Sequence, residues 1–442
     1  MKVFVHKLGC PKNDVDADYI AARLIAEGHE PVSRPEDAES IIVNTCGFIL
    51  PAREESVDEI LRLGQLKKNG LLKTLYAAGC LSQRHGDDLL REMPELDGAF
   101  GIGALDSLAS AVTKNQHLES AVRRDTRKLG FLGWKDRYIS DSFPWAYLKI
   151  SDGCDRACSY CSIPLMRGKF RSRPIESIRR EAEFLASNGK RELILVSQEA
   201  TMYGYGLPER PLLIDLLKDL ETVDGVRWIR LLYLHPAELD QSLIDYLAAD
   251  NKTVNYYDLP LQHISDRILS AMNRQTTSKQ IRQKLDSIRS SSDSAIIRTT
   301  FMVGFPGETD AEFEELMDFV SQQRFERMGT FAFSCEEGTL ATTLPGAVQE
   351  ELAHERLDRL MTTQRDIAFE ANNSLIGSQA TVIIDAVAED GQAEARTPGD
   401  TPEIDPVVFV YGDNLGIGDM CTVQIESADG YDLRGKVKRK LP

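Results

Sequence analysis

Six of the eight cysteines fall into two sets that predict metal chemistry, and the first set is local. Cys154, Cys158 and Cys161 form a C-x3-C-x2-C run just after the apolar segment Ala146–Ile150, which predicts a strand. Loops that follow barrel strands usually carry an enzyme's chemistry. Three thiolates leave one coordination position open, whereas a structural zinc site needs four ligands. A 4Fe–4S cluster with one iron free of cysteine fits this count, and buried unpaired thiols are the alternative.

The second set is dispersed along the chain. Cys10, Cys46 and Cys80 each follow an apolar run that predicts a strand, at residues 2–6, 41–44 and 72–77. The carboxyl ends of parallel strands share one edge of a sheet, so we expect these thiols to meet there as a second three-thiolate site. The alternative is three small buried residues at strand ends. Cys335 and Cys421 have no partner at ligand spacing and are interpreted as packing residues.

Three α/β or β regions are expected to position these cysteines. Strand and helix patterns alternate over the first 115 or so residues, with the last helix at 87–92, which predicts a doubly wound parallel sheet. Six further strand patterns separated by helices predict a partial TIM-like barrel of about six βα units, followed by a long helix over Glu350–Asn372. These strands are expected at 146–150, 193–196, 228–232, 256–259, 296–303 and 328–333. Short β-rich runs then predict a small antiparallel β-barrel. We therefore expect an N-terminal domain at 1–117, a linker at 118–142, a barrel at 143–372 and a C-terminal domain at 373–442.

The overall charge restricts the class of partner. The 442-residue chain carries a net charge of −17 and a pI of about 5.0. We expect no strong nucleic-acid binding, which needs a basic surface, and a basic partner is favoured. No apolar stretch long enough for a membrane span and no signal-peptide pattern is found, so we expect a cytoplasmic location. In that reducing compartment cysteines more often bind metals or catalyse reactions than form disulfides.

The motifs around the cysteines resemble those of a known superfamily. The Cys154 run, with Tyr160 before its last cysteine, is similar to the radical S-adenosylmethionine enzymes. The two-cluster layout resembles the methylthiotransferases within them, over essentially the whole chain. The segments that carry this likeness include LGCPKNDVDAD, NTCGFI, AAGCLSQR, CSYCSIPLMRGKFRSRP, LPLQHISDRILSAMNR and TTFMVGFPGET. Pro11-Lys12-Asn13 resembles the RimO-type branch, whereas transfer-RNA enzymes tend to have Gln-Met-Asn there.

This resemblance implies a reaction and its cofactors. Members hold two 4Fe–4S clusters and use S-adenosylmethionine, and their last domain is a TRAM domain. The RimO-type branch methylthiolates the β-carbon of an aspartate in small-subunit ribosomal protein S-twelve. The implied scheme uses one S-adenosylmethionine to methylate a sulfur at the N-terminal cluster and a second to generate the radical that removes hydrogen from the substrate. A reduced flavodoxin-like protein is the implied electron donor.

Further residues are candidates for S-adenosylmethionine binding. They lie at or just beyond predicted barrel-strand ends, or beside the cluster cysteines: Tyr160, Gln198, Thr201, His235, Gln262, Gly304 and Glu308. Plain turn residues or groups that satisfy a buried loop are equally plausible for several of them. The basic residues Arg167, Lys169, Arg171 and Arg173 contact an anionic group or form a solvated loop.

Charge in the last domain separates the candidate functions. From Asn373 onward there are twelve acidic and six basic residues, a net charge of −6, although the end reads KVKRK. An RNA-binding domain should be basic, so a basic protein substrate is favoured over a transfer-RNA adenosine. A solvated acidic face is the alternative interpretation of the charge. A non-catalytic iron–sulfur carrier is the function of another class, and turnover of S-adenosylmethionine would separate it from an enzyme.

Overall fold

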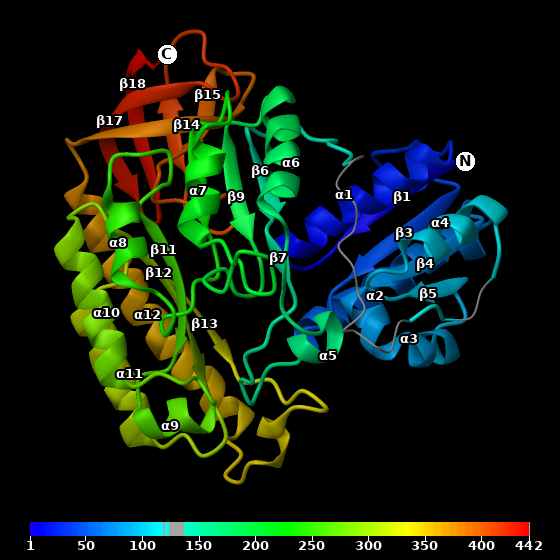
Figure 1. The fold of residues 1–442 in the computed structure, drawn as a ribbon, viewed down its shortest axis with the longest axis horizontal. Coiled ribbons are helices and arrows are strands. Elements are labelled where there is room, and N and C mark those ends of the chain that lie inside the picture. Colours follow the sequence, from blue (N-terminus) through cyan, green and yellow to red (C-terminus); the bar gives the residue numbers. More distant parts are fainter. Residues whose placement is uncertain (118–119, 123–136, 442) are drawn as a thin grey trace.

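The computed structural model describes residues 1–117, 120–122 and 137–441, and it divides into three folded regions (Figure 1). The N-terminal region is blue to cyan, the central barrel green to yellow, and the C-terminal barrel orange to red. Most of the expected linker at 118–142 falls outside the described residues. Within the described residues, no helix combines the length and apolar character needed to cross a membrane.

The N-terminal region is a five-stranded, fully parallel sheet in the order β2-β1-β3-β4-β5. Alternate side chains of β3 enter different cores: Ile41 and Val43 pack with α2 and α3, while Ile42 packs with α1 and α4. Helices therefore cover both faces, as the alternating pattern predicts. The elements are β1 (Lys2–Lys7), α1 (Pro11–Ala26), β2 (Glu30–Pro31), η1 (Pro35–Asp37), β3 (Ser40–Thr45), α2 (Leu50–Lys68), β4 (Thr74–Gly79), α3 (Cys80–Glu92), β5 (Gly98–Phe100) and α4 (Leu105–Lys114).

The central region contains six parallel strands in two three-stranded sheets, β10-β9-β6 and β11-β12-β13. The expected partial barrel is confirmed, and its strands β6 (Trp145–Lys149), β9 (Glu192–Val196), β10 (Trp228–Leu231), β11 (Tyr256–Gln262), β12 (Ile296–Val303) and β13 (Arg327–Ala332) match the six predicted runs closely. The other elements are β7 (Ser151–Asp152), α5 (Ile163–Arg167), β8 (Arg171–Ser172), α6 (Ile175–Ser187), α7 (Leu213–Glu221), α8 (Gln241–Ala248), α9 (Asp266–Ala271), α10 (Ser278–Ser291), α11 (Asp310–Gln323), η3 (Leu340–Thr343) and α12 (Glu350–Ser374). One apolar core joins the strands to the surrounding helices.

The C-terminal region is a closed five-stranded barrel in the order β14-β15-β16-β18-β17. Its strands are β14 (Gln379–Val387), β15 (Gln392–Arg396), β16 (Val408–Tyr411), β17 (Met420–Asp429) and β18 (Asp432–Lys440). The small barrel is confirmed, but β16 pairs with β18 in parallel, whereas the other pairs are antiparallel. The four antiparallel pairs join the strands into an open sheet whose two edges are β16 and β18. The parallel pair between these edge strands closes the barrel.

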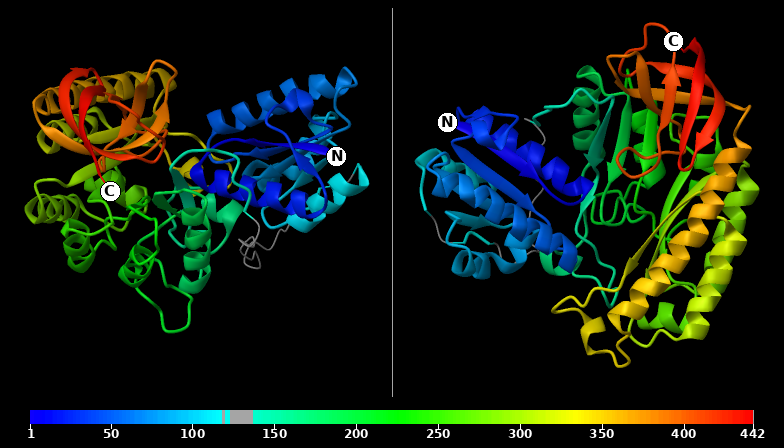
Figure 2. Two further views of the ribbon diagram at one scale, coloured as in Figure 1. Left: turned by 90° about the horizontal axis from the view of Figure 1, so that it is seen from above. Right: turned by 180° about the vertical axis from the view of Figure 1, so that it is seen from behind.

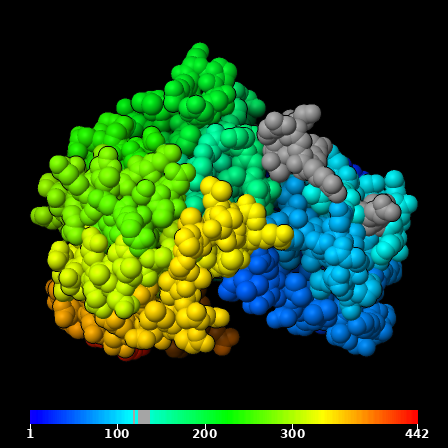
Figure 3. All heavy atoms as spheres, turned by 90° about the horizontal axis from the view of Figure 1, so that it is seen from below, coloured from blue at the N-terminus to red at the C-terminus, as the bar shows by residue number. Residues whose placement is uncertain are grey.

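The N-terminal region lies beside the central barrel (Figure 2). The two regions contact each other at two places. Helix α1 packs on β6, and α3 packs on α5. The segment after β13 also reaches across, as the yellow atoms beside the blue domain show (Figure 3). There the buried carboxylate of Glu336 pairs with Arg53 of α2 and, at 2.8 Å, with Arg84 of α3. The two cysteine-bearing regions are therefore held against one another.

Candidate functional site

The three N-terminal cysteines lie together at the carboxyl edge of the parallel sheet. Cys10 directly precedes α1, Cys46 directly follows β3, and Cys80 is the first residue of α3. The strands before them, β1, β3 and β4, are neighbours in the sheet. Gly9 has a φ of +90°, and a β-carbon there would lie 2.9 Å from the sulfur of Cys46. Only glycine allows this close approach of the two loops.

Two thiols of this set, Cys46 and Cys80, lose their protons less readily than an exposed cysteine does. Burial raises the pKa of Cys46 to about 12, and the nearby Cys10 and Cys80 raise it further. Burial also raises the pKa of the Cys80 thiol. A coordinating metal centre reverses this balance, because it binds the thiolate form and releases the proton. The donor set therefore fits an iron–sulfur cluster in chemistry as well as in number.

Asn13 links the three loops of this set. Its fully buried amide nitrogen donates to the carbonyl oxygens of Leu8, at 2.9 Å, and Thr45, at 3.0 Å, which precede two of the cysteines. Its amide oxygen lies 3.7 Å from the sulfur of Cys80. One side chain thus fixes the spacing of the loops that carry Cys10, Cys46 and Cys80.

Arg167 joins the N-terminal set to the barrel. It ends α5, six residues after Cys161, and is 1% exposed. Its guanidinium donates to the amide oxygen of Asn13 at 2.8 Å and forms ion pairs with Asp16 at 2.9 Å and Asp152 at 3.3 Å. A planar guanidinium can make all these contacts at once. A side chain from the barrel therefore completes the buried surroundings of the N-terminal cysteines.

The barrel cysteines occupy the loop between β7 and α5, as the sequence predicts. Burial is the main cause that raises the pKa of Cys154 to about 11 and of Cys161 to about 12. Arg274 approaches the sulfur of Cys158 at 3.6 Å. Tyr160 is half-buried among apolar side chains below this loop. Three thiols and one buried guanidinium thus face a common space.

Neither set closes around one ion. Among residues 1–117, 120–122 and 137–441, no group of three or more His, Cys, Asp or Glu side chains is arranged to hold a single metal ion. Each set supplies three thiols, one fewer than a structural zinc site needs, and three cysteines fit a 4Fe–4S cluster with one open iron.

Four of the softer candidates lie at the carboxyl ends of neighbouring barrel strands. Gln198 and Thr201 follow β9, His235 follows β10, and Gln262 ends β11. Buried amide atoms of Gln198 and Gln262 and the Nε2 of His235 have no hydrogen-bond partner among the residues that the structure describes. Thr201 contacts this group through its hydroxyl, which accepts from the backbone N–H of His235 at 3.3 Å. Unpartnered buried polar atoms are costly, so this cluster fits a polar ligand such as S-adenosylmethionine.

His235 is neutral in this setting. Burial lowers its pKa to about 2, and the guanidinium groups of Arg274 and Arg156 lower it further. Its Nδ1 accepts from the N–H of Ala237 at 3.2 Å. The proton of the neutral ring therefore lies on Nε2, which is left as a donor toward the strand ends.

Gly304 and Glu308 lie elsewhere in the barrel rim and support a turn. The Glu308 carboxylate accepts from the backbone N–H groups of Gly304 and, at 3.2 Å, Phe305. It also faces Arg356 at 3.4 Å and His263 at 3.7 Å. The contact with His263 places Glu308 beside the residue that follows Gln262, and one oxygen of its carboxylate has no hydrogen-bond partner among the described residues. A role for Gly304 and Glu308 in S-adenosylmethionine binding stays a prediction.

The basic residues after the barrel cysteines are mostly engaged inside the protein. Arg173 is buried and pairs with Glu181 at 2.7 Å, and Arg171 donates to backbone carbonyls of its own loop. Only Lys169 of the four is well exposed. Arg167 and Arg173 thus have structural roles, whereas the buried Nε and Nη2 of Arg171 have no hydrogen-bond partner among the described residues. Contact of Arg171 or Lys169 with an anionic group stays a prediction.

Comparison with known proteins finds relatives that align with the whole chain. RimO of Clostridioides difficile (strain 630), named as a ribosomal protein uS12 methylthiotransferase, is 41% identical over 442 residues and covers 100% of both chains. The protein of that name from Thermosipho africanus is 43% identical over 437 residues, 99% of each chain. This chain belongs to the RimO methylthiotransferase family. The RimO-type resemblance found in the motifs is thereby confirmed.

Three family models match separate parts of this RimO-family chain. The radical SAM superfamily matches residues 148–320, the uncharacterized protein family UPF0004 matches 2–101, and the TRAM domain matches 376–437. Among solved structures, the radical S-adenosylmethionine methyltransferase TsrM from Kitasatospora setae has a TM-score of 0.56 at 14% identity, covering 89% of this chain and 80% of that chain. The cobalamin-dependent radical enzyme OxsB has a TM-score of 0.51 at 14% identity, covering 82% and 56%. At this identity the likeness shows the fold alone.

Several residues of the site were not predicted. Asn13 and Arg274 act through contacts between segments far apart in sequence, and Arg167 was expected only as part of a basic group. Asn13 lies in a polar helix start, Lys12-Asn13-Asp14, so its polarity alone did not single it out.

Proposed function

We propose that this protein transfers a methylthio group to the β-carbon of an aspartate in ribosomal protein uS12, using two S-adenosylmethionine molecules, a sulfur source and reducing electrons. One observation carries the proposal. A chain that aligns over its full length with RimO enzymes brings its motif cysteines into two groups of three, linked by Asn13 and Arg167.

The cofactors are assigned to these groups. We infer that Cys10, Cys46 and Cys80 hold one 4Fe–4S cluster and that Cys154, Cys158 and Cys161 hold the other. S-adenosylmethionine is assigned to the strand ends near Gln198, Thr201, His235 and Gln262, with Tyr160 lying beside the barrel cluster. When bound, these groups supply the radical chemistry that an unactivated C–H bond requires.

The chain's own residues contribute binding, orientation and exclusion of water. Neutral His235 offers an Nε2 donor, and the free amide atoms of Gln198 and Gln262 offer donors and acceptors to a polar ligand. Arg274 places a positive charge beside Cys158, which favours a negatively charged cluster there. Burial of these groups keeps water and oxygen from the reacting carbon.

The electrostatics of the chain support a basic protein substrate. The net charge is −17, and the C-terminal region alone is acidic by six charges. Ribosomal proteins that bind RNA are basic, so complementary charge would steer uS12 to this enzyme. We further propose a cytoplasmic location and a flavodoxin-like electron donor. The proposed domains are 1–117, 143–372 and 373–442, joined by 118–142, and the three matched family regions lie within them.

Mass spectrometry tests the proposal directly. The anaerobically reconstituted protein is incubated with dithionite, S-adenosylmethionine and sulfide, and with either uS12 or transfer RNA carrying modified adenosine. A gain of one methylthio group on an aspartate of uS12 is expected. A gain on the RNA would overturn the substrate, and absence of 5′-deoxyadenosine would instead favour an iron–sulfur carrier.

A further inference from the structure

Lys12 is a buried cation without an acidic partner. It lies in the first turn of α1, two residues after Cys10, and is 6% exposed. Its ammonium group lies 3.4 Å from the centroid of the Tyr233 ring. No Asp or Glu among the described residues forms an ion pair with it, and the nearby Asp16 is taken by Lys149 and Arg167. Its neighbours are the Tyr233 side chain, with which it also forms a hydrogen bond, and the Cys10 thiol. A buried ammonium usually has a carboxylate partner, so its remaining N–H donors are available to another anion.

The aromatic partner of Lys12 is held in a strained conformation. Tyr233 follows β10 and has a φ of +63°. This backbone conformation is unfavourable in free energy for any residue other than glycine. The backbone around it is fixed on both sides: its N–H donates to Asp258 at 2.9 Å, and its carbonyl accepts from the N–H of Ala200 at 2.9 Å. Such strain persists where the surroundings impose it, and it concentrates at ligand-binding sites. The fold therefore fixes the position of the ring beneath Lys12.

The contact between Lys12 and Tyr233 spans the two cysteine sets. Lys12 follows Cys10 of the N-terminal set. Tyr233 comes two residues before His235, which faces the strand ends beside the barrel set. A substrate carbon that reacts between the two sets must pass close to this pair.

We propose that Lys12 binds the side-chain carboxylate of the substrate aspartate, and this inference rests on the proposed function. In aspartate the carboxylate is attached directly to the β-carbon, so fixing the carboxylate also fixes the reacting carbon. Lys12 has three N–H donors and can keep the ring of Tyr233 on one side while it donates to a carboxylate on another. A neutral carboxamide of the same shape would not satisfy the ammonium charge. Lys12 would thus select aspartate over asparagine.

The test compares two forms of uS12 against four proteins. The reactive aspartate is mapped by mass spectrometry with the wild-type enzyme, and a second uS12 carries asparagine at that position. Binding of each form to reconstituted wild type, Lys12→Met, Lys12→Arg and Lys68→Met is measured by calorimetry. Lys68 is an exposed lysine on α2 that pairs with Glu95, and it serves as the matched control. Iron content and the visible spectrum are recorded for every protein.

The wild type and Lys68→Met are expected to bind the aspartate form about 30-fold or more tightly than the asparagine form. Lys12→Met should bind both forms equally, with unchanged iron, and Lys12→Arg should retain a preference because it keeps the charge. A preserved preference in Lys12→Met would overturn the proposal. Iron loss with equal weakening of both forms would also overturn it, because Lys12 would then serve the cysteine site. If the wild type does not modify uS12 at all, the proposed function fails, and the Lys12 assignment fails with it.

Discussion

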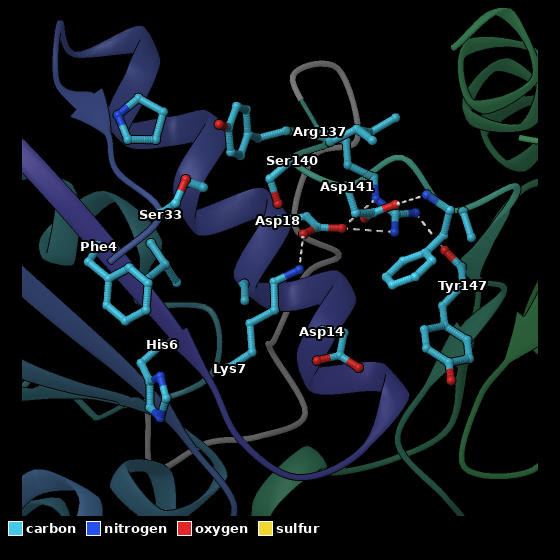
Figure 4. Close-up of a pocket in the computed structure, with 18 of the residues that line it drawn as sticks. Phe4, His6, Lys7, Asp14, Asp18, Ser33, Arg137, Ser140, Asp141 and Tyr147 are labelled. Carbon is cyan, nitrogen blue, oxygen red and sulfur yellow. Dashed lines mark hydrogen bonds and ion pairs between the residues drawn. The ribbon is translucent and has the colours of Figure 1, made fainter. Parts of the chain in front are cut away.

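Replacing Asp14 by asparagine should stabilise this protein, and the gain should depend on pH. Asp14 lies on α1 and faces a crevice of about 580 Å³ between the N-terminal region and the barrel (Figure 4). The cations there are engaged by other carboxylates: Lys7 pairs with Asp18 at 2.7 Å and Arg137 pairs with Asp18 at 2.9 Å. Burial raises the pKa of Asp14 from its ordinary 3.8 to about 6, and the negative charges of Glu403 and Asp18 add to this effect.

The size and sign of the effect follow from that pKa. A carboxyl group with a raised pKa binds its proton more tightly in the folded chain than in the unfolded chain. Asp14 therefore has no unfavourable effect below about pH 4, and its penalty grows as the pH rises to about 6. Above pH 6 the full penalty is present, and a shift of this size corresponds to about 3 kcal/mol. Asn cannot ionise, so Asp14→Asn removes the penalty.

Scanning calorimetry of the wild type and Asp14→Asn between pH 4 and pH 8 measures this difference. The variant should melt several degrees higher than the wild type at pH 8 and at nearly the same temperature at pH 4. Asp58→Asn, which removes an exposed carboxylate on α2, is the control and should show no such trend. A variant that is less stable at pH 8, or a difference that does not change with pH, would refute the reasoning.

Three further predictions concern the two cysteine sets and the contact between them. Cys46→Ala and Cys161→Ala should each lower the iron content of reconstituted protein by about half, because each removes a ligand from a different cluster. Iron and sulfide analysis measures this content. A total loss of iron from either change would contradict two independent sites. Asn13→Ala should speed iron release to a chelator from the N-terminal set only, since it removes two hydrogen bonds between its loops; equal release from both sets would be the contrary result. Glu336→Gln should lower the free energy of unfolding by about 3 kcal/mol, because it leaves the buried Arg84 without a carboxylate. Hydrogen exchange should rise in the segments around both residues. Unchanged protection would show that the pair does not hold the regions together.

Local patterns predicted the elements well where burial sets the pattern. The strand β12 at Ile296–Val303 was predicted to the residue, because its β-branched and apolar side chains form a strand pattern in which buried positions first alternate and then run on to Val303. Helix α3 was predicted only from Asp87, although it begins at Cys80. A kink at His85, with φ −132° and ψ 27°, separates the first part of α3 from the part that was predicted. The parallel pairing of β16 with β18 depends on how the barrel closes, which no local pattern records.

The same distinction applies to the site. The six cysteines could be placed from the sequence because three lie in one short run and the others follow strands that share an edge. The residues that hold these cysteines together could not be placed from the sequence. Asn13 meets Arg167 across 154 residues, and the basic group that contains Arg167 gives no sign of which distant residue it contacts. Only the docking of two separately folded regions brings them into contact.

That docking has a consequence for how the two sites depend on one another. The amide oxygen of Asn13 is satisfied by Arg167, and the same guanidinium balances Asp16 on α1 and Asp152 on the barrel. If the N-terminal region were separated from the barrel, Asn13 would lose its donor and Asp16 would keep no partner from its own domain, because Lys149 also comes from the barrel. Water would replace these partners on separation, so each lost hydrogen bond costs about 1 kcal/mol, and each lost hydrogen bond to a charged group somewhat more. The N-terminal cysteine site therefore reaches its final geometry only when the barrel, with its own cysteine set, is in place.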